Sequence, residues 1–276
     1  NLHEIFGAMV TPSGQISGEF PVFKAPGSQT SPSLAFDGTN YLVVWEDTRS
    51  GSGPSVDTDV FGTRVTPGGV VLDPGGISIT TAPGFQGAPR VIFDGTNYFV
   101  VWLDVQTGFN FVPPPTKIFG KRIKTDGTLL DGPPDTGGIA INTSGLPITN
   151  PTLTFDGTNY LVVWSVEDYP NNPQAGIFTA RVSTDGLLLD DPISGVVISE
   201  PICFACKLVS PVILFSGQSS LLIWVNNSEL SGTTKDIVGT IIFSTLTTVS
   251  PPNESPVAVL SGPTTALKRE MVTFDA

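Results

Sequence analysis

The sequence predicts an all-β protein built from repeats, and three observations lead to this fold class. The chain of 276 residues contains 30 glycines and 25 prolines, and only 14% of its residues are charged, a composition that suits short strands and turns better than helices. The hexapeptide FDGTNY occurs at Phe36, Phe93 and Phe155, and each copy leads into an apolar run that ends in tryptophan. The four tryptophans are 57, 62 and 60 residues apart. Such a fixed period indicates a repeat architecture.

Each repeat is expected to contain four strands. The first ends at the phenylalanine of the hexapeptide, where apolar and polar residues alternate up to Phe36. The Asp-Gly pair at 37–38 predicts a hairpin turn, because glycine accepts a positive φ. The second strand, 41–45, is apolar throughout and should be covered on both faces. The third carries a recurring marker such as VFGTRV at 60–65, and the fourth is a Gly- and Ile-rich segment such as 76–79.

Antiparallel four-stranded units with buried middle strands predict a β-propeller, because neighbouring blades of a propeller stack face to face. A β-sandwich is the rival fold, but it does not account for one near-identical hairpin in every repeat of about 60 residues. We expect a closed ring of about five to seven blades with further repeats upstream. The alternative is a four-bladed ring closed by a strand at 15–23. The expected boundaries are a propeller at 1–246, with a half blade at 1–24 and repeats that begin near 30, 88, 150 and 210.

The segments 45–51 and 59–65, WEDTRSG and DVFGTRV, resemble the repeats of the sialidase-like (BNR-type) β-propeller superfamily. They look still more like the propeller repeats of large secreted surface proteins. The resemblance implies a propeller fold and not sialidase activity, which needs three converging arginines and a tyrosine nucleophile. The repeated turn contains Tyr41, Tyr98 and Tyr160, which leaves only Tyr169 for such a role.

The C-terminal segment, 255–276, resembles the opening strands of a PKD-type Ig-like domain. Residues 247–254 contain two consecutive prolines and are expected to form a linker to it. PKD-type modules belong to extracellular multidomain proteins, so this resemblance implies an extracellular or cell-surface location. The chain begins with Asn and shows no signal peptide, and we expect it to be a piece of a longer product.

The charge of the chain limits the kinds of partner that it can bind. Lys and Arg total 13 against 25 Asp and Glu, and the net charge of −12 argues against nucleic-acid binding. No run of about 18 apolar residues is present, so no membrane insertion is expected.

The loops after the second strand of each repeat differ in every copy and are the expected binding surface. They are rich in carboxylates, and Asp47, Asp57 and Asp59 are candidate Ca²⁺ ligands because calcium prefers such oxygens. The alternative is a solvated acidic rim, and no cofactor is otherwise expected. A pair of carboxylates here could hydrolyse a glycosidic bond, but no spacing singles out a pair. The apolar segment 109–115 is either a cover for the core or a contact patch.

The remaining candidate sites are covalent. Cys203 and Cys206 form a CxxC pair, for which a structural disulfide in an oxidising compartment is expected. A redox dithiol, half of a metal site and a haem attachment are the alternatives. Three glycosylation sequons begin at Asn142, Asn226 and Asn253, outside the expected strand centres.

These observations predict a non-enzymatic, extracellular structural or adhesive propeller module of a larger cell-surface or filament-associated protein. Its expected partners are other surface or filament subunits, and glycans, held by the variable loops, and no catalytic residue is assigned. The alternative is a carbohydrate-active enzyme, sialidase-like or another glycoside hydrolase, which predicts a pocket with paired carboxylates or clustered arginines. A third possibility is a filament subunit that exchanges strands at 5–10 or 257–276.

Overall fold

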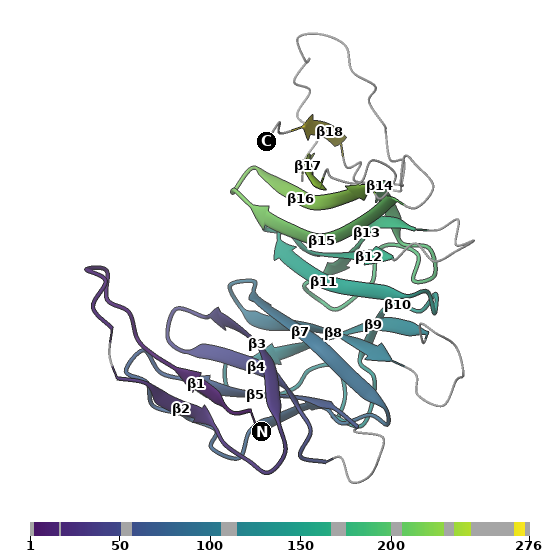
Figure 1. The fold of residues 1–276 in the computed structure, drawn as a ribbon. Helices are drawn as coiled ribbons and strands as arrows, with labels where there is room; N and C mark the ends of the chain where they lie inside the picture. Colours follow the sequence, from purple (N-terminus) through teal and green to yellow (C-terminus); the bar gives the residue numbers. More distant parts are fainter. Residues whose placement is uncertain are drawn as a thin grey trace.

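The computed structural model shows an arc of antiparallel sheets (Figure 1). It describes residues 3–16, 18–50, 57–105, 115–166, 175–199, 206–228, 235–243 and 268–273. Within these ranges the regular structure is all strand, in four sheets of four strands and one of two, so the predicted all-β class is confirmed. No helix in this described part is long and apolar enough to cross a membrane.

Consecutive strands of the chain build each sheet. The N-terminal pair is β1 (Ile5–Gly7) and β2 (Phe20–Phe23). Sheet I contains β3 (Gln29–Phe36), β4 (Tyr41–Asp47), β5 (Asp59–Val65) and β6 (Ile77–Thr80), and sheet II contains β7 (Phe85–Phe93), β8 (Asn97–Val105), β9 (Thr116–Lys124) and β10 (Ile139–Asn142). Sheet III contains β11 (Ile148–Phe155), β12 (Asn159–Val166), β13 (Gly176–Ser183) and β14 (Val196–Ser199), and sheet IV contains β15 (Cys206–Phe215), β16 (Ser219–Ser228), β17 (Lys235–Phe243) and β18 (Lys268–Thr273).

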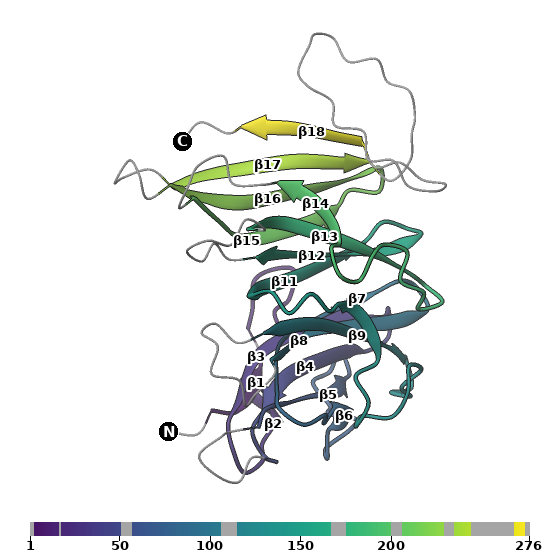
Figure 2. The same ribbon diagram turned by 90° about the vertical axis from the view of Figure 1, so that its right-hand side faces the viewer.

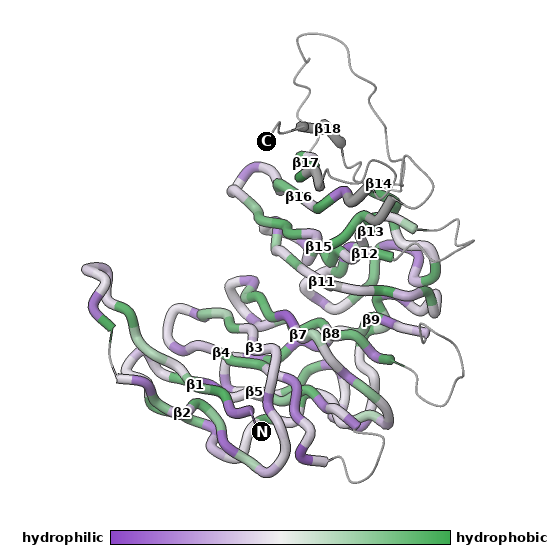
Figure 3. The backbone as a smooth tube through the Cα atoms, viewed as in Figure 1, coloured by the Kyte–Doolittle hydropathy of each residue, from purple (hydrophilic) through white to green (hydrophobic). Residues whose placement is uncertain are grey.

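The sheets stack in the manner of propeller blades. The first strands of the sheets, β3, β7, β11 and β15, contact one another in sequence along the concave side of the arc (Figures 1 and 2). The second strands of sheets I, II and III are buried on both faces, as predicted, and the side chains of Leu42, Val44, Trp45 and Trp102 are fully covered. In sheet IV the second strand is less covered, with Leu221 42% exposed. Hydrophobic segments run along the strands (Figure 3), and each gap between neighbouring sheets holds its own apolar cluster. This order of strands and cores is propeller-like.

The hexapeptide is a hairpin turn, as predicted. In its first copy the Oδ1 atom of Asp37 accepts hydrogen bonds from the backbone N–H groups of Thr39, at 2.7 Å, and Asn40, at 2.6 Å. Gly38 takes a φ of 94°, which a residue with a Cβ adopts only with strain. Burial acts to raise the pKa of Asp37, but the two backbone N–H groups hold it below its usual value.

The tyrosines that close the second and third hexapeptides also tie neighbouring sheets together, a contact that the sequence did not predict. The hydroxyl of Tyr98 in sheet II donates to the carbonyl oxygen of Asn40 in sheet I at 2.9 Å. The hydroxyl of Tyr160 in sheet III donates to the carboxylate of Asp94 in sheet II. Burial, together with these carboxylate-bearing turns, raises the pKa of both tyrosines. The repeated hexapeptide is therefore a turn and an inter-sheet contact at once.

A second repeated contact comes from the arginine of the third strand. Arg64, Arg122 and Arg181 each pair with an aspartate nine residues later, with Nη2–Oδ1 distances of 2.8, 2.7 and 2.7 Å to Asp73, Asp131 and Asp190. The guanidinium of Arg122 also donates from Nη1 to the carbonyl oxygen of Thr184 in the next sheet at 2.8 Å. Each pair ties the third strand to the segment that follows it. Arg64 and Arg122 also bond to the next sheet.

The strands at the two ends of the arc show which strands could close a ring. Strand β2 pairs with β1 and, among the described residues, with no strand of sheet IV, so the structure gives no support to the alternative in which a strand at 15–23 closes a four-bladed ring. The outermost strand of sheet IV is β18, which pairs with β17 in antiparallel register. Strand β18 lies within the segment that resembles the opening of a PKD-type domain, and that assignment stays a prediction.

Candidate functional site

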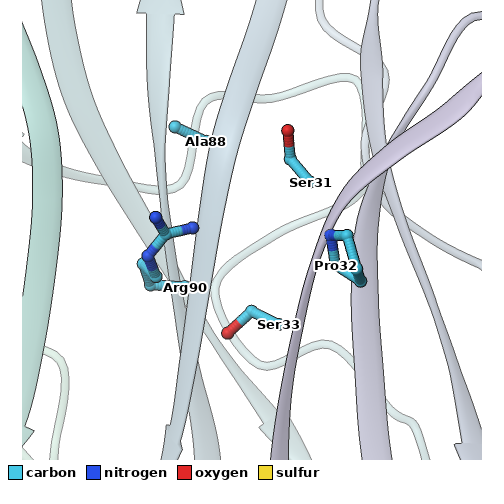
Figure 4. Close-up of a pocket in the computed structure, with 5 residues that line it drawn as sticks. All are labelled: Ser31, Pro32, Ser33, Ala88 and Arg90. Carbon is cyan, nitrogen blue, oxygen red and sulfur yellow. The ribbon is translucent and has the colours of Figure 1, made fainter.

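A pocket of about 280 Å³ opens between the inner strands β3 and β7. Side chains of the two strands face the gap from opposite sides (Figure 4). We call this the inter-blade pocket; it is lined by Ser31, Pro32, Ser33, Ala88 and Arg90.

Local backbone bulges shape this pocket. The register between the first two strands of each sheet shifts by a β-bulge, between Thr30 and Ser33 in sheet I and between Gly87 and Arg90 in sheet II. Ser31 and Ala88, at the bulges, have φ angles of 54° and 50°, a left-handed conformation that costs residues with a Cβ about 1–3 kcal/mol. A proline follows each of them, and proline inside a strand signals such a bulge in the sequence.

The bulge recurs in sheets III and IV, where the register shifts at 149–152 and 209–212. It therefore belongs to the repeat. The side chains that differ between the sheets, and not the bulge itself, give the inter-blade pocket its chemistry.

Hydrogen bonds fix the two walls of the pocket against each other. Glu46, on β4, accepts from the backbone N–H of Ala88 at 2.6 Å through Oε1 and from the hydroxyl of Thr30 at 2.9 Å through Oε2. Further along the gap, Ser33 Oγ accepts from the backbone N–H of Val91 at 3.3 Å. A pocket held in this way loses little conformational freedom when a ligand binds.

Arg90 is the charged group of the pocket. Its Nη1 donates to the carbonyl oxygen of Pro89 at 2.9 Å. The ion pairs found among the described residues engage Arg49, Arg64, Arg122 and Arg181, but not Arg90. The positions that match Arg90 in sheets I, III and IV are Ser33, Thr152 and Val212.

Rows of buried and half-buried polar residues lie beside the pocket at the variable-loop end of the first two sheets. In sheet I, Gln29, Asp47 and Asp59 are paired across three strands, and in sheet II the equivalent row is Gln86, Asp104 and Lys117. Residues directly opposite in an antiparallel pair point to the same face. Gln29 and Gln86 are 1% and 0% exposed, and no hydrogen-bond partner of their amide groups is found among the described residues.

The same row in sheet III is apolar, because Ile148, Val166 and Gly176 occupy it. The fold therefore does not require polar residues at these positions.

The pKa values of the carboxylates in the two rows are shifted in opposite directions. Burial acts to raise the pKa of Asp47, but hydrogen bonds from Arg49 and from Trp45 Nε1, at 2.8 Å, hold it below its usual value. Burial raises the pKa of Asp59, and the charges of Asp47 and Asp57 add to this. Burial also raises the pKa of Asp104. These opposite shifts are typical of sites that move protons, although buried structural networks produce them too.

The contribution of Asp47 to folding stability should depend on pH. Its pKa is depressed in the folded protein, so its contribution is present above the unfolded value of 3.8 and is lost as pH falls through the folded value. We expect Asp47→Asn to lower the urea midpoint at pH 7 far more than at pH 2.5. The exposed turn variant Asp185→Asn is the control, and an equal loss for Asp47→Asn at both pH values would contradict the assignment.

The predicted calcium ligands are only partly brought together. Asp47 and Asp59 lie opposite each other on β4 and β5, but Arg49 Nη2 contacts Asp47 Oδ2 at 2.5 Å and occupies that carboxylate. Among the described residues, no group of three or more His, Cys, Asp and Glu side chains could hold a metal ion. Calcium binding stays a prediction.

Of the predicted covalent sites, the structure describes the side chains of Asn142 and Asn226. Asn142 is 2% exposed, and its Oδ1 accepts from the backbone N–H and the hydroxyl of Ser144 at 3.0 and 2.7 Å, so its burial argues against a glycan in the folded chain. Asn226 is half-buried at the end of β16. Asn253, Cys203, the side chain of Cys206 and the segment 109–114 lie outside the described residues.

The sequence matches no protein-family model and no curated protein. Solved structures similar to the chain include a thermostable family-43 glycoside hydrolase, with 10% identity, a TM-score of 0.45 and coverage of 88% of both chains. An endo-arabinase from Bacteroides thetaiotaomicron has 13% identity and a TM-score of 0.43, with 89% of this chain and 94% of that one covered. A xylan β-1,4-xylosidase from Bacillus halodurans has 16% identity and a TM-score of 0.44, and the match covers 78% of this chain and only 40% of the xylosidase.

These structures correct the functional prediction. They are glycoside hydrolases, which contradicts the predicted non-enzymatic structural or adhesive module and the prediction of no enzymatic activity. The finding agrees with the alternative, a carbohydrate-active enzyme. It gives no support to the sialidase-like and PKD-type resemblances.

Proposed function

We propose that this chain is the propeller part of a carbohydrate-active protein of the glycoside hydrolase type, and that its glycan binds in the inter-blade pocket. The observation that carries the proposal is a pocket with fixed walls and a few convergent polar side chains, Ser31, Ser33 and Arg90. Such a combination is typical of small-ligand sites. Its volume of about 280 Å³ is near the lower end of the usual range for ligand sites and suits one small unit of a polymer.

Hydrolysis of a glycosidic bond needs one carboxylic acid and one carboxylate. Glu46 and Asp104 both adjoin the start of β7: Glu46 bonds to Ala88 N–H, and Asp104 lies opposite Gln86. Burial raises the pKa of Asp104, which favours the protonated form that a general acid requires. We therefore assign the acid to Asp104 and the carboxylate to Glu46.

The test is release of reducing ends from a panel of xylan, mannan, arabinan and galacturonan by the purified chain. We expect at least one polymer to be cleaved, and Glu46→Gln and Asp104→Asn each to lower kcat by about 10²- to 10⁴-fold. Asp185→Asn, an exposed turn at the other end of the strands, should cleave as the wild type does. Cleavage of no polymer, or unchanged rates in both variants, would overturn the proposal.

The proposal also covers the size of the complete ring and the location of the protein. Further blades complete the ring, to a total of about five to seven. In support, inner-strand side chains at both ends of the arc are apolar and uncovered, with Leu34 60% and Leu214 72% exposed. The chain works outside the cell, where polymeric glycans are encountered. A Cys203–Cys206 disulfide and a PKD-type segment at 255–276 would suit that location.

A further inference from the structure

The guanidinium of Arg90 has spare binding capacity. Arginine carries five N–H donors, and within the described part of the chain Arg90 uses one of them, on the carbonyl oxygen of the preceding residue. The arginines of the third strands are different, because each binds an aspartate with its guanidinium, as Arg122 binds Asp131. Arg90 therefore keeps a planar fork on a wall of the inter-blade pocket.

No carboxylate of the described pocket competes for this fork. The pocket lining contains no acidic side chain, and the nearby Glu46 already accepts from Ala88 N–H and from the hydroxyl of Thr30. The chain carries a net charge of −12, which repels anions in general. Arg90 therefore places a positive charge in the pocket of a protein whose net charge is negative.

The surrounding groups suit a sugar that bears an acid. The hydroxyls of Ser31 and Ser33 lie across the gap from Arg90 (Figure 4), and Pro32 also lines the pocket. Guanidinium binds planar carboxylates through two parallel hydrogen bonds, a geometry that neutral hydroxyls do not match.

From these contacts we propose that the inter-blade pocket selects an acidic glycan, with Arg90 binding the carboxylate of a hexuronate unit and the two serines binding its ring hydroxyls. This inference rests on the proposed glycan site and names its substrate class. The arginine is a specificity-determining residue here, because the equivalent positions of the other sheets carry Ser33, Thr152 and Val212.

Calorimetric titration of the whole chain can test this inference. The probes are an oligogalacturonate, its methyl ester, a neutral galactan oligomer of the same length and a sulfated galactan oligomer. We expect the oligogalacturonate to bind at least about 10-fold more tightly than its methyl ester or the neutral oligomer, and added salt to weaken it. Arg90→Gln should lose about 10- to 100-fold in affinity for the acid, while Arg90→Lys should lose less, because it keeps the charge but not the fork.

The control variant is Lys124→Gln, which removes the same charge at an exposed position at the end of β9 and should leave binding unchanged. Equal affinity of wild type and Arg90→Gln for the oligogalacturonate would overturn the inference, as would tight binding of the methyl ester. Tighter binding of the sulfated oligomer that depends on Arg90 would replace the carboxylate with a sulfate and overturn the hexuronate assignment. If a neutral polymer is cleaved while no acidic one binds, the proposed function survives and this inference fails; if no glycan binds or is cleaved, both fail.

Discussion

Replacement of Arg122 by alanine is expected to lower the free energy of unfolding by about 3 kcal/mol, because it leaves a carboxylate without its partner. The side chains of Arg122 and Asp131 are 16% and 12% exposed, and their Nη2–Oδ1 distance is 2.7 Å. The variant also removes the bond from Arg122 Nη1 to the carbonyl oxygen of Thr184 in the next sheet. Urea unfolding of wild type and variant, followed by tryptophan fluorescence, measures the difference.

The matched control is the exposed pair Lys24–Glu4, whose side chains are 51% and 36% exposed at an N–O distance of 3.0 Å. Lys24→Ala should change the unfolding free energy by less than about 1 kcal/mol, because water screens such a pair. A double-mutant cycle of Arg122→Ala and Asp131→Ala then isolates the coupling. A cost for Arg122→Ala no larger than that of Lys24→Ala would show that the repeated arginine pairs do not hold the sheets together.

Gly138→Ala is expected to have a comparable effect, about 3 kcal/mol, for a steric reason. Gly138 has a φ of 81°, which costs a residue with a Cβ about 1–2 kcal/mol. A Cβ there would also lie 2.6 Å from the carbonyl oxygen of Gly120 and 2.9 Å from Cγ of Lys121, and such overpacking costs about 1–3 kcal/mol.

The disturbance would reach a buried ammonium group. Lys121 is fully buried, and its Nζ donates to the carbonyl oxygens of Ile79, Pro133 and Thr136 at 3.2, 2.5 and 3.0 Å. Burial lowers its pKa and the charges of Asp131 and Asp135 act to raise it, while the three carbonyl oxygens satisfy the donors of the ammonium group. A shift of Lys121 would leave donors and acceptors unpaired between sheets I and II.

Gly95→Ala separates the two causes. Gly95 has a φ of 97°, but beyond its chain neighbours no atom lies within 4 Å of the place that a Cβ would take. Only the backbone strain of about 1–2 kcal/mol therefore applies to this variant. Thermal unfolding should rank wild type first, Gly95→Ala second and Gly138→Ala last. Equal losses in the two variants would mean that the close approach to Gly120 carries no cost.

The repeat, its hairpins and the buried second strands could be predicted from the amino-acid sequence alone. These features depend on residues close together in the chain: Asp37 and Gly38 make a turn locally, and an unbroken apolar run up to Trp45 has to be covered on both faces. The proline after each bulge, as at Pro32 and Pro89, is a further local signal, and it marks where the first strand of a sheet departs from regular pairing.

The place of the inter-blade pocket could not be predicted from the sequence, which favoured the variable loops as the binding surface. Ser33 and Arg90 are far apart in the chain and face one another only because sheets I and II stack, which no local pattern encodes. The same holds for the bond from Tyr98 to Asn40 and for the carboxylate of Glu46 on Ala88. Periodicity fixes what each sheet contains, whereas the register between sheets depends on long-range packing, and the pocket forms in that register.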